Sequence, residues 1–140
     1  MIEQRRGRVL VIDDEPALGR VINRILAPEH DAVVMTSPEE ALARIAAGER
    51  FDVILCDLSM PGMDGVELYE RVGAIAPALI EQIVVMTGGA FTARTAAFLD
   101  RPCIRRLDKP FEPEHLRRLV RERVPSVTPR GNDQDEGGGR

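Results

Sequence analysis

The sequence is poor in aromatic residues and has no tryptophan at all. Aromatic residues make up 4% of its 140 residues, and the formal net charge is −4. A dedicated nucleic-acid surface usually combines net basic charge with stacking aromatic rings, so we expect no direct binding of nucleic acid. No apolar run approaches the ~18 residues that a membrane-spanning helix needs, and no hydrophobic export signal follows Arg5 and Arg6. We therefore expect a cytoplasmic protein that does not bind membranes.

Cysteine is also scarce, with two residues in the whole chain. Cys56 and Cys103 each lie among strand-like apolar residues, where cysteine behaves as a small hydrophobic side chain. A cytoplasmic location also disfavours a disulfide. We expect two buried thiols that belong to no functional site.

Short apolar runs are spaced regularly along a chain whose length suits one domain. Residues 9–12, 53–56 and 83–86 are unbroken runs rich in β-branched side chains, the pattern of strands covered on both faces in a parallel sheet. Residues 32–35 and 103–107 are shorter or more polar, which suits strands at the edges. The pattern predicts five strands, three of them central.

Helical signals separate these strands. The clearest helix opens at Pro16 and ends before Pro28, with one apolar stripe along it. Proline, capping and glycine signals predict further helices at 38–47, 65–76, about 92–99 and 113–123. Right-handed crossovers then place helices on both faces of a parallel α/β sheet. We expect an extension at 1–7, one domain at 8–124 and, because apolar periodicity is lost, a disordered tail at 125–140.

Acidic residues follow two of the predicted central strands. Asp13 and Asp14 come directly after residues 9–12, and Asp57 comes after 53–56. Ligands in such folds bind beyond the carboxyl ends of the strands, where these side chains would meet. Carboxylates crowded together raise one another's pKa unless a cation neutralises them, and oxygen donors that leave positions for water and phosphate favour Mg²⁺ over Ca²⁺. Any one of these acids alone could be an ordinary loop residue, but their combination favours a metal and phosphoryl site.

Four motifs occur in register along the chain, and they are Val9 to Pro16, Asp57 to Gly65, Met86-Thr87-Gly88 and Asp108-Lys109-Pro110-Phe111. Together they resemble the receiver domain of two-component response regulators, a family related to the single-domain chemotaxis regulator. The resemblance covers residues 8 to about 124. It implies a flavodoxin-like, doubly wound (βα)5 sheet with strand order 2-1-3-4-5, and a phosphoacceptor switch that carries no output domain in this chain.

The resemblance also implies roles for individual residues. Asp57 would accept a phosphoryl group from the phosphohistidine of a histidine kinase or a phosphotransfer protein. Asp14, Asp57 and the backbone carbonyl of Ser59 would hold Mg²⁺, and Asp13 would act through a metal-bound water. Lys109 would pair with a phosphoryl oxygen. These roles agree with phosphoryl transfer, which demands charge neutralisation and positioning above all.

Two further residues belong to the predicted switch. Thr87 would donate its hydroxyl to another phosphoryl oxygen, and the bond between Lys109 and Pro110 would be cis. The family usually has Tyr or Phe three residues before the lysine, where this sequence has Arg106. Our hypothesis is that Arg106 supplies a switchable charge on the output surface instead.

The segment 101–123 contains eight basic residues and four acidic ones, a net charge of +4. A charge run of this kind is often only a solvated helix face. The functional alternative is an acidic effector protein that docks on the fourth helix, fifth strand and fifth helix, the surface that the resemblance implies for partner binding. The chain would be a monomer or a phosphorylation-dependent dimer.

Two other classes of function fit the sequence less well than the switch. A haloacid-dehalogenase-like phosphohydrolase would need a second acid two residues after its nucleophile, where this chain has Ser59. A phosphorylation-independent binding module would not need the acidic cluster. The same segment also fits either a single-domain protein or a receiver from a hybrid kinase. The resemblance implies that Ser59 and Gly89 stand at positions that modulate access of the attacking water, and because both residues are small we expect a short-lived phosphoryl group.

Overall fold

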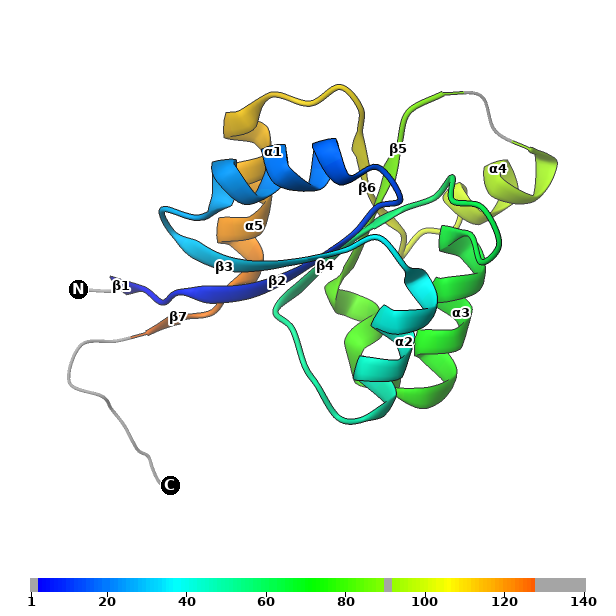
Figure 1. The fold of residues 1–140 in the computed structure, drawn as a ribbon, viewed down its shortest axis with the longest axis horizontal. Coiled ribbons are helices and arrows are strands. Elements are labelled where there is room, and N and C mark those ends of the chain that lie inside the picture. The colour runs from blue at the N-terminus through cyan, green and yellow to red at the C-terminus, as the bar shows by residue number, and fades with distance from the viewer. Residues whose placement is uncertain (1–2, 90–91, 128–140) are drawn as a thin grey trace.

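Five parallel strands form the centre of the structure, a computed structural model that describes residues 3–89 and 92–127 (Figure 1). The strands are β2 (Gly7–Ile12), β3 (His30–Met35), β4 (Val53–Asp57), β5 (Ile83–Thr87) and β6 (Arg105–Asp108). Their order across the sheet is β3-β2-β4-β5-β6. Numbered as the five strands of the repeat, this is 2-1-3-4-5, so the predicted fold is confirmed.

The helices form a layer on each face of this sheet (Figure 1). On one face lie α1 (Pro16–Leu26) and α5 (Pro113–Arg123), and on the other lie α2 (Pro38–Ala46), α3 (Gly65–Ile75) and α4 (Ala93–Leu99). The sequence analysis missed the 3₁₀ helix η1 (Pro77–Gln82), which follows α3. None of the helices in the described ranges is long and apolar enough to cross a bilayer.

Local capping explains where two of these helices begin. The Ser37 hydroxyl accepts a hydrogen bond from the Glu40 backbone N–H, and Pro38 occupies the first turn of α2. The Asp64 carboxylate accepts a hydrogen bond from the backbone N–H of Glu67 at the start of α3. A side-chain cap of this kind typically contributes ~1 kcal/mol to stability.

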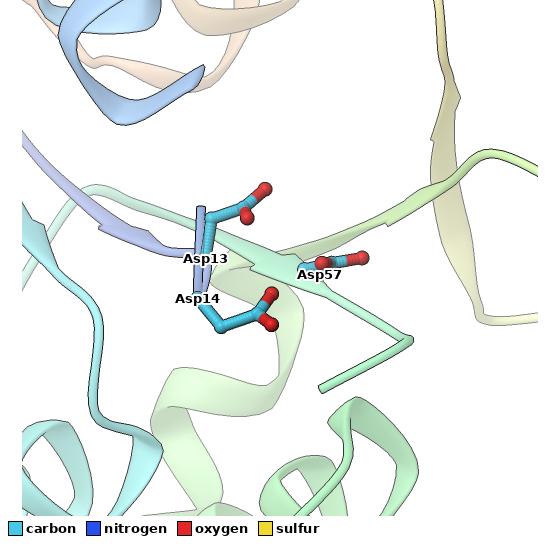
Figure 2. Close-up of side chains that lie close together, drawn as sticks. All are labelled: Asp13, Asp14 and Asp57. Atoms are coloured by element: carbon cyan, nitrogen blue, oxygen red, sulfur yellow. The ribbon is translucent and has the colours of Figure 1, made fainter. Parts of the chain in front are cut away.

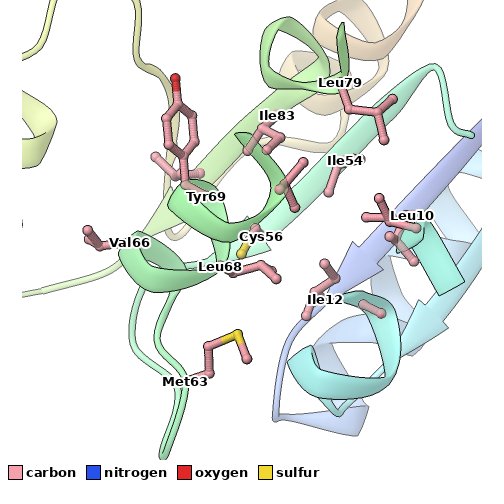
Figure 3. Close-up of a cluster of buried hydrophobic side chains, with 14 of the residues drawn as sticks. Leu10, Ile12, Ile54, Cys56, Met63, Val66, Leu68, Tyr69, Leu79 and Ile83 are labelled. Carbon is pink, nitrogen blue, oxygen red and sulfur yellow. The ribbon is translucent and has the colours of Figure 1, made fainter. Parts of the chain in front are cut away.

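Two hydrophobic cores lie on opposite faces of the sheet. Along β2, Val9 and Val11 pack on the α1 and α5 side, while Leu10 and Ile12 pack on the other side. Figure 3 shows Leu10 and Ile12 in that second core, in one cluster with Ile54 and Leu68. Full burial of such a side chain contributes about 1.5–3 kcal/mol, and burial on both faces explains why the central strands are unbroken apolar runs.

Two parts of the chain differ from the sequence-based expectations. Strand β1 (Glu3–Gln4) pairs with β7 (Ser126–Val127) in a separate antiparallel sheet. The tail predicted from residue 125 therefore opens with a paired strand, and its residues 128–140 lie outside the described part. The proposed domain boundaries stay a prediction.

The expected burial of both cysteines is wrong for one of them. Cys56 is buried in β4, but Cys103 is exposed. The reason is that β6 begins at Arg105, so Cys103 lies in the turn before the strand and not within it. Both thiols are free.

Candidate functional site

Three carboxylates meet at the carboxyl ends of β2 and β4, two of the three central strands. Asp13 and Asp14 directly follow β2, and Asp57 is the last residue of β4. One oxygen from each side chain lies within 4.8 Å of the others. Figure 2 shows the three carboxylates turned toward a common space beyond the strand ends. The structure therefore brings together the acids that the sequence predicted to converge.

The parallel register and the loops after the strands fix these side chains. Ile12 is the partner of Cys56 across β2 and β4, so Asp13 and Asp57 leave the sheet at the same level. The Asp13 carboxylate accepts a hydrogen bond from the Glu15 backbone N–H at 2.9 Å. The Asp57 carboxylate accepts one from the Ser59 backbone N–H at 3.2 Å. Each acid is thus held by the backbone of its own loop.

A glycine allows α3 to start against the end of β4. A Cβ atom on Gly65 would lie 2.6 Å from the Asp57 carbonyl oxygen and 2.8 Å from the Leu58 Cα, closer than real contacts allow. The Gly65 backbone N–H donates to the carbonyl of Leu58 at 3.1 Å. The turn after Asp57 is therefore packed directly on the helix.

Lys109 supplies a cation at this cluster. Its Nζ lies 3.3 Å from Asp13 Oδ2 and 3.4 Å from Asp57 Oδ1. Burial disfavours the charged amine, but the carboxylates of Asp57 and Asp13 outweigh it and raise the pKa of Lys109. The peptide bond between Lys109 and Pro110 is cis, as expected from the resemblance.

Asp57 lies in an environment that resists its negative charge. Its side chain is 7% exposed, and burial raises the pKa of its carboxyl group above the ordinary value. The Ser59 N–H and the Lys109 ammonium oppose that rise without cancelling it. One ammonium faces three carboxylates. This excess of negative charge, presented by oxygen donors alone, suits a hard divalent cation such as Mg²⁺.

A hollow of about 310 Å³ opens beside Asp57. The described residues that line it are Glu15, Asp57, Ser59, Gly88, Gly89 and Lys109. The two glycines contribute no side chains, which leaves room beside the carboxylate for a group the size of a phosphoryl. The sequence analysis did not identify Glu15 as a lining residue, although it directly follows the two predicted metal ligands.

The structure places Thr87 differently from the other candidates. Its side chain is buried, and its hydroxyl donates to Asp108 Oδ1 at 2.8 Å. Thr87 is not among the described residues that line the hollow. The Arg106 guanidinium donates to the same Asp108 oxygen, from Nε at 3.0 Å and from a terminal nitrogen at 2.9 Å. Thr87 and Arg106, predicted as two switch residues, are thus joined through an acid that the sequence analysis assigned no role.

Beside this pair, the exposed face of β6 and α5 is basic. Arg105, Arg106, Arg118 and Arg123 line a hollow of about 240 Å³ together with His115, Leu119 and Glu122. The predicted basic segment therefore gathers side chains from a strand and a helix into one concave surface. We call these residues the basic groove.

Comparison with known proteins places this geometry in a family. The model of the response regulator receiver domain matches residues 9–121. The transcriptional regulatory protein FixJ of Bradyrhizobium diazoefficiens is 27% identical over 124 residues, which cover 89% of this chain and 60% of FixJ. The DNA-binding response regulator MtrA of Mycolicibacterium smegmatis is 30% identical over 124 residues, covering 88% of this chain and 53% of MtrA. The chain thus spans little more than half of these relatives.

Solved structures agree with the sequence matches. The chemotaxis protein CheY4 of Vibrio cholerae superposes with a TM-score of 0.69 at 25% identity, over 85% of this chain and 99% of CheY4. A response regulator receiver domain protein of Methanospirillum hungatei gives a TM-score of 0.72 at 26% identity, over 85% of this chain and 94% of that one. With a family model matching residues 9–121, the strand order and the acidic cluster, the chain belongs to the response regulator receiver domain family.

Proposed function

We propose that Asp57 of this chain accepts a phosphoryl group from a phosphohistidine and so acts as a signalling switch. An Asp57 carboxylate oxygen forms the new bond to phosphorus, the bond between phosphorus and the histidine nitrogen breaks, and the imidazole leaves with the electron pair. The observation that supports this best is the placement of Asp57. It is buried, lies 3.4 Å from the Lys109 ammonium and faces an open hollow.

Asp13, Asp14, Asp57 and the backbone carbonyl of Ser59 would hold Mg²⁺ in this proposal. When bound, the ion would neutralise charge that builds up on the phosphoryl oxygens. Residues of the chain supply the other interactions with the phosphoryl group. Lys109 pairs with one phosphoryl oxygen, and the Asp57 carboxylate is kept in line by the N–H of Ser59. Receiver domains bind Mg²⁺ at an acidic pocket, and the donor set here fits that ion.

The phosphorylated form would act through partner proteins. A histidine kinase or a phosphotransfer protein would supply the phosphoryl group, and an effector would recognise the altered surface. The basic groove has the charge to bind an acidic effector segment, with Arg105, Arg106, Arg118 and Arg123 on one concave face. Phosphorylation would raise the population of a conformer that already exists in the free protein. If Arg106→Ala left both effector affinity and its dependence on phosphorylation unchanged, this role of Arg106 would be excluded.

The test of the phosphoacceptor role uses acetyl phosphate as a small donor. In the presence of Mg²⁺ the wild-type mass should rise by one phosphoryl group, and Asp57→Asn should show no increase. Asp31→Asn is the matched control, because Asp31 is an exposed aspartate in β3 whose side chain pairs with Arg6, away from the cluster. Equal uptake by wild type and Asp57→Asn would reject the site.

A second assay, with a phosphate ester as the substrate, separates a switch from a phosphohydrolase. A switch takes up one phosphoryl group and releases it slowly compared with an enzyme's turnover. Repeated turnover of a phosphate ester would instead support the hydrolase. Ser59 stands where that class of enzyme needs a second acid, which disfavours the hydrolase.

A further inference from the structure

Asp108 lies directly beside Thr87 in the sheet and binds its hydroxyl. Thr87 and Asp108 are Cα partners in the parallel pair of β5 and β6, so their side chains leave the sheet on the same face. Thr87 is buried and Asp108 is exposed. The buried hydroxyl donates a hydrogen bond to the exposed carboxylate, with 2.8 Å between Thr87 Oγ1 and Asp108 Oδ1.

The acceptor oxygen of Asp108 is held on both sides. Arg106 lies two residues earlier on β6 and donates twice to Asp108 Oδ1, while Leu107 between them points into the α1 and α5 core. The hydroxyl of Thr87 and the guanidinium of Arg106 lower the pKa of Asp108. The carboxylate is therefore charged at neutral pH and remains a strong acceptor for the hydroxyl of Thr87.

A threonine hydroxyl carries a single hydrogen. It can donate that hydrogen to Asp108 or to a phosphoryl oxygen on Asp57, but not to both. We propose that Asp108 is a positioning residue that holds Thr87 in the unphosphorylated conformer, by competing with the phosphoryl group for the hydroxyl hydrogen of Thr87. This inference rests on the proposed phosphoacceptor role of Asp57.

The competition has a measurable cost for activation. If only a fraction of the molecules has Thr87 released from Asp108, the apparent affinity for a phosphoryl mimic is the intrinsic affinity multiplied by that fraction. A hydrogen bond to a charged acceptor is stronger than a neutral one, but the exposure of Asp108 lets water replace it. We therefore expect loss of the acceptor to tighten binding of a phosphoryl mimic about 3- to 10-fold.

The experiment measures binding of beryllium fluoride, a mimic of the phosphoryl group, by calorimetry in the presence of Mg²⁺. Asp108→Ala should bind the mimic about 3- to 10-fold more tightly than wild type. Asp108→Asn keeps an acceptor oxygen for Thr87 and should remain closer to wild type. Asp100→Ala is the control for loss of an exposed aspartate, since Asp100 follows α4 and should leave the affinity unchanged.

Repeating the measurement in a variant that lacks the Thr87 hydroxyl separates the effect of the hydrogen bond from the effect of the Asp108 charge. Removing the negative charge of Asp108 would by itself favour an anion nearby, with or without the hydroxyl. Thr87→Val keeps the shape of the side chain but removes the hydroxyl, so any gain from Asp108→Ala in this background reports charge alone and should be smaller than the gain with Thr87 present. An equal gain from Asp108→Ala in both backgrounds, or no gain in either, would overturn the proposal.

The ligand-free protein gives an independent measurement. The NMR methyl signal and three-bond couplings of Thr87 should report one side-chain rotamer in wild type and rotamer averaging in Asp108→Ala. Identical signals in the two proteins would overturn the role of Asp108, whatever happens at Asp57. A third outcome separates the two proposals. If wild type binds the mimic and accepts a phosphoryl group but Asp108→Ala changes neither the affinity nor the NMR signals, the proposed function stands and only this inference is overturned.

Discussion

Replacing Asp57 with asparagine should make the protein more stable when divalent ions are absent. At an effective dielectric constant of 20, two carboxylates at the 4.8 Å limit within which these oxygens lie repel by about 3.5 kcal/mol, and Asp57 faces two such neighbours in Asp13 and Asp14. The attraction between the Lys109 ammonium and the Asp57 carboxylate, at 3.4 Å, offsets about 5 kcal/mol of this repulsion. Removing the charge of Asp57 thus gains about 2 kcal/mol before screening at the exposed Asp14 is counted, and about 1 kcal/mol after it.

The pH dependence of this gain has a definite sign. The pKa of Asp57 is raised in the folded protein, so the folded state binds the proton more tightly than the unfolded chain does. Wild-type stability from this group is therefore fully present below the unfolded pKa of about 3.9 and is lost as the pH rises through the folded pKa. The advantage of Asp57→Asn should be small near pH 3.5 and reach its full size at pH 7.

Thermal melting followed by circular dichroism measures the effect in EDTA and again with added MgCl₂. A gain of about 1 kcal/mol corresponds to a rise of about 3 to 5 °C in melting temperature for a domain of this size. Magnesium at ~10 times its Kd should stabilise wild type by about 1.4 kcal/mol and the variant far less. The difference in melting temperature between the two proteins should therefore shrink or change sign. A lower melting temperature for Asp57→Asn than for wild type in EDTA would refute the electrostatic reasoning, and Asp100→Asn, at an exposed aspartate after α4, serves as the control.

Three further predictions concern stability and reactivity. Gly65→Ala should destabilise the protein by about 1–3 kcal/mol in urea unfolding, because the new Cβ lies 2.8 Å from the Leu58 Cα and the backbone must shift. Burial lowers the pKa of His30, so as the pH falls the imidazole is protonated in the unfolded chain before it is protonated in the folded protein. Stability should therefore fall as the pH drops below about 6.5, and His30→Gln should reduce this dependence of stability on pH. In the folded protein a thiol reagent should modify Cys103 rapidly and spare Cys56, whose burial raises its pKa, whereas both react in denaturant.

The fold was predictable because the central strands are buried on both faces. Strands buried on both faces have apolar residues at every position, so they appear in the sequence as unbroken apolar runs. Proline and capping residues mark the helices that separate these runs. The pairing of β1 with β7 was not predictable in the same way, because strands of two residues carry no periodicity. The burial of Cys103 was predicted wrongly for a related reason, since one apolar residue beside an edge strand does not say where the strand begins.

The site was predictable to the extent that it depends on strand ends. Asp13, Asp14 and Asp57 are visible as acids after buried runs, and the sheet topology must bring them together. The contact between Thr87 and Asp108 depends instead on the register of β5 against β6. A shift of one residue would place the two side chains on opposite faces. No local pattern in the sequence specifies that register.

Arg106 connects the two ends of the proposed switch. It donates to the carboxylate that holds Thr87, and it also lines the basic groove. A change at Thr87 would therefore alter the hydrogen bonds of the carboxylate that Arg106 binds, without the movement of an aromatic ring that is usual in the family. Coupling between two binding sites is reciprocal. If phosphorylation changes the affinity of the groove for an acidic peptide by some factor, the peptide must change the affinity for beryllium fluoride by the same factor. Titrating each ligand in the presence of the other measures both factors, and unequal values would show that the effect is not an equilibrium coupling through this pair.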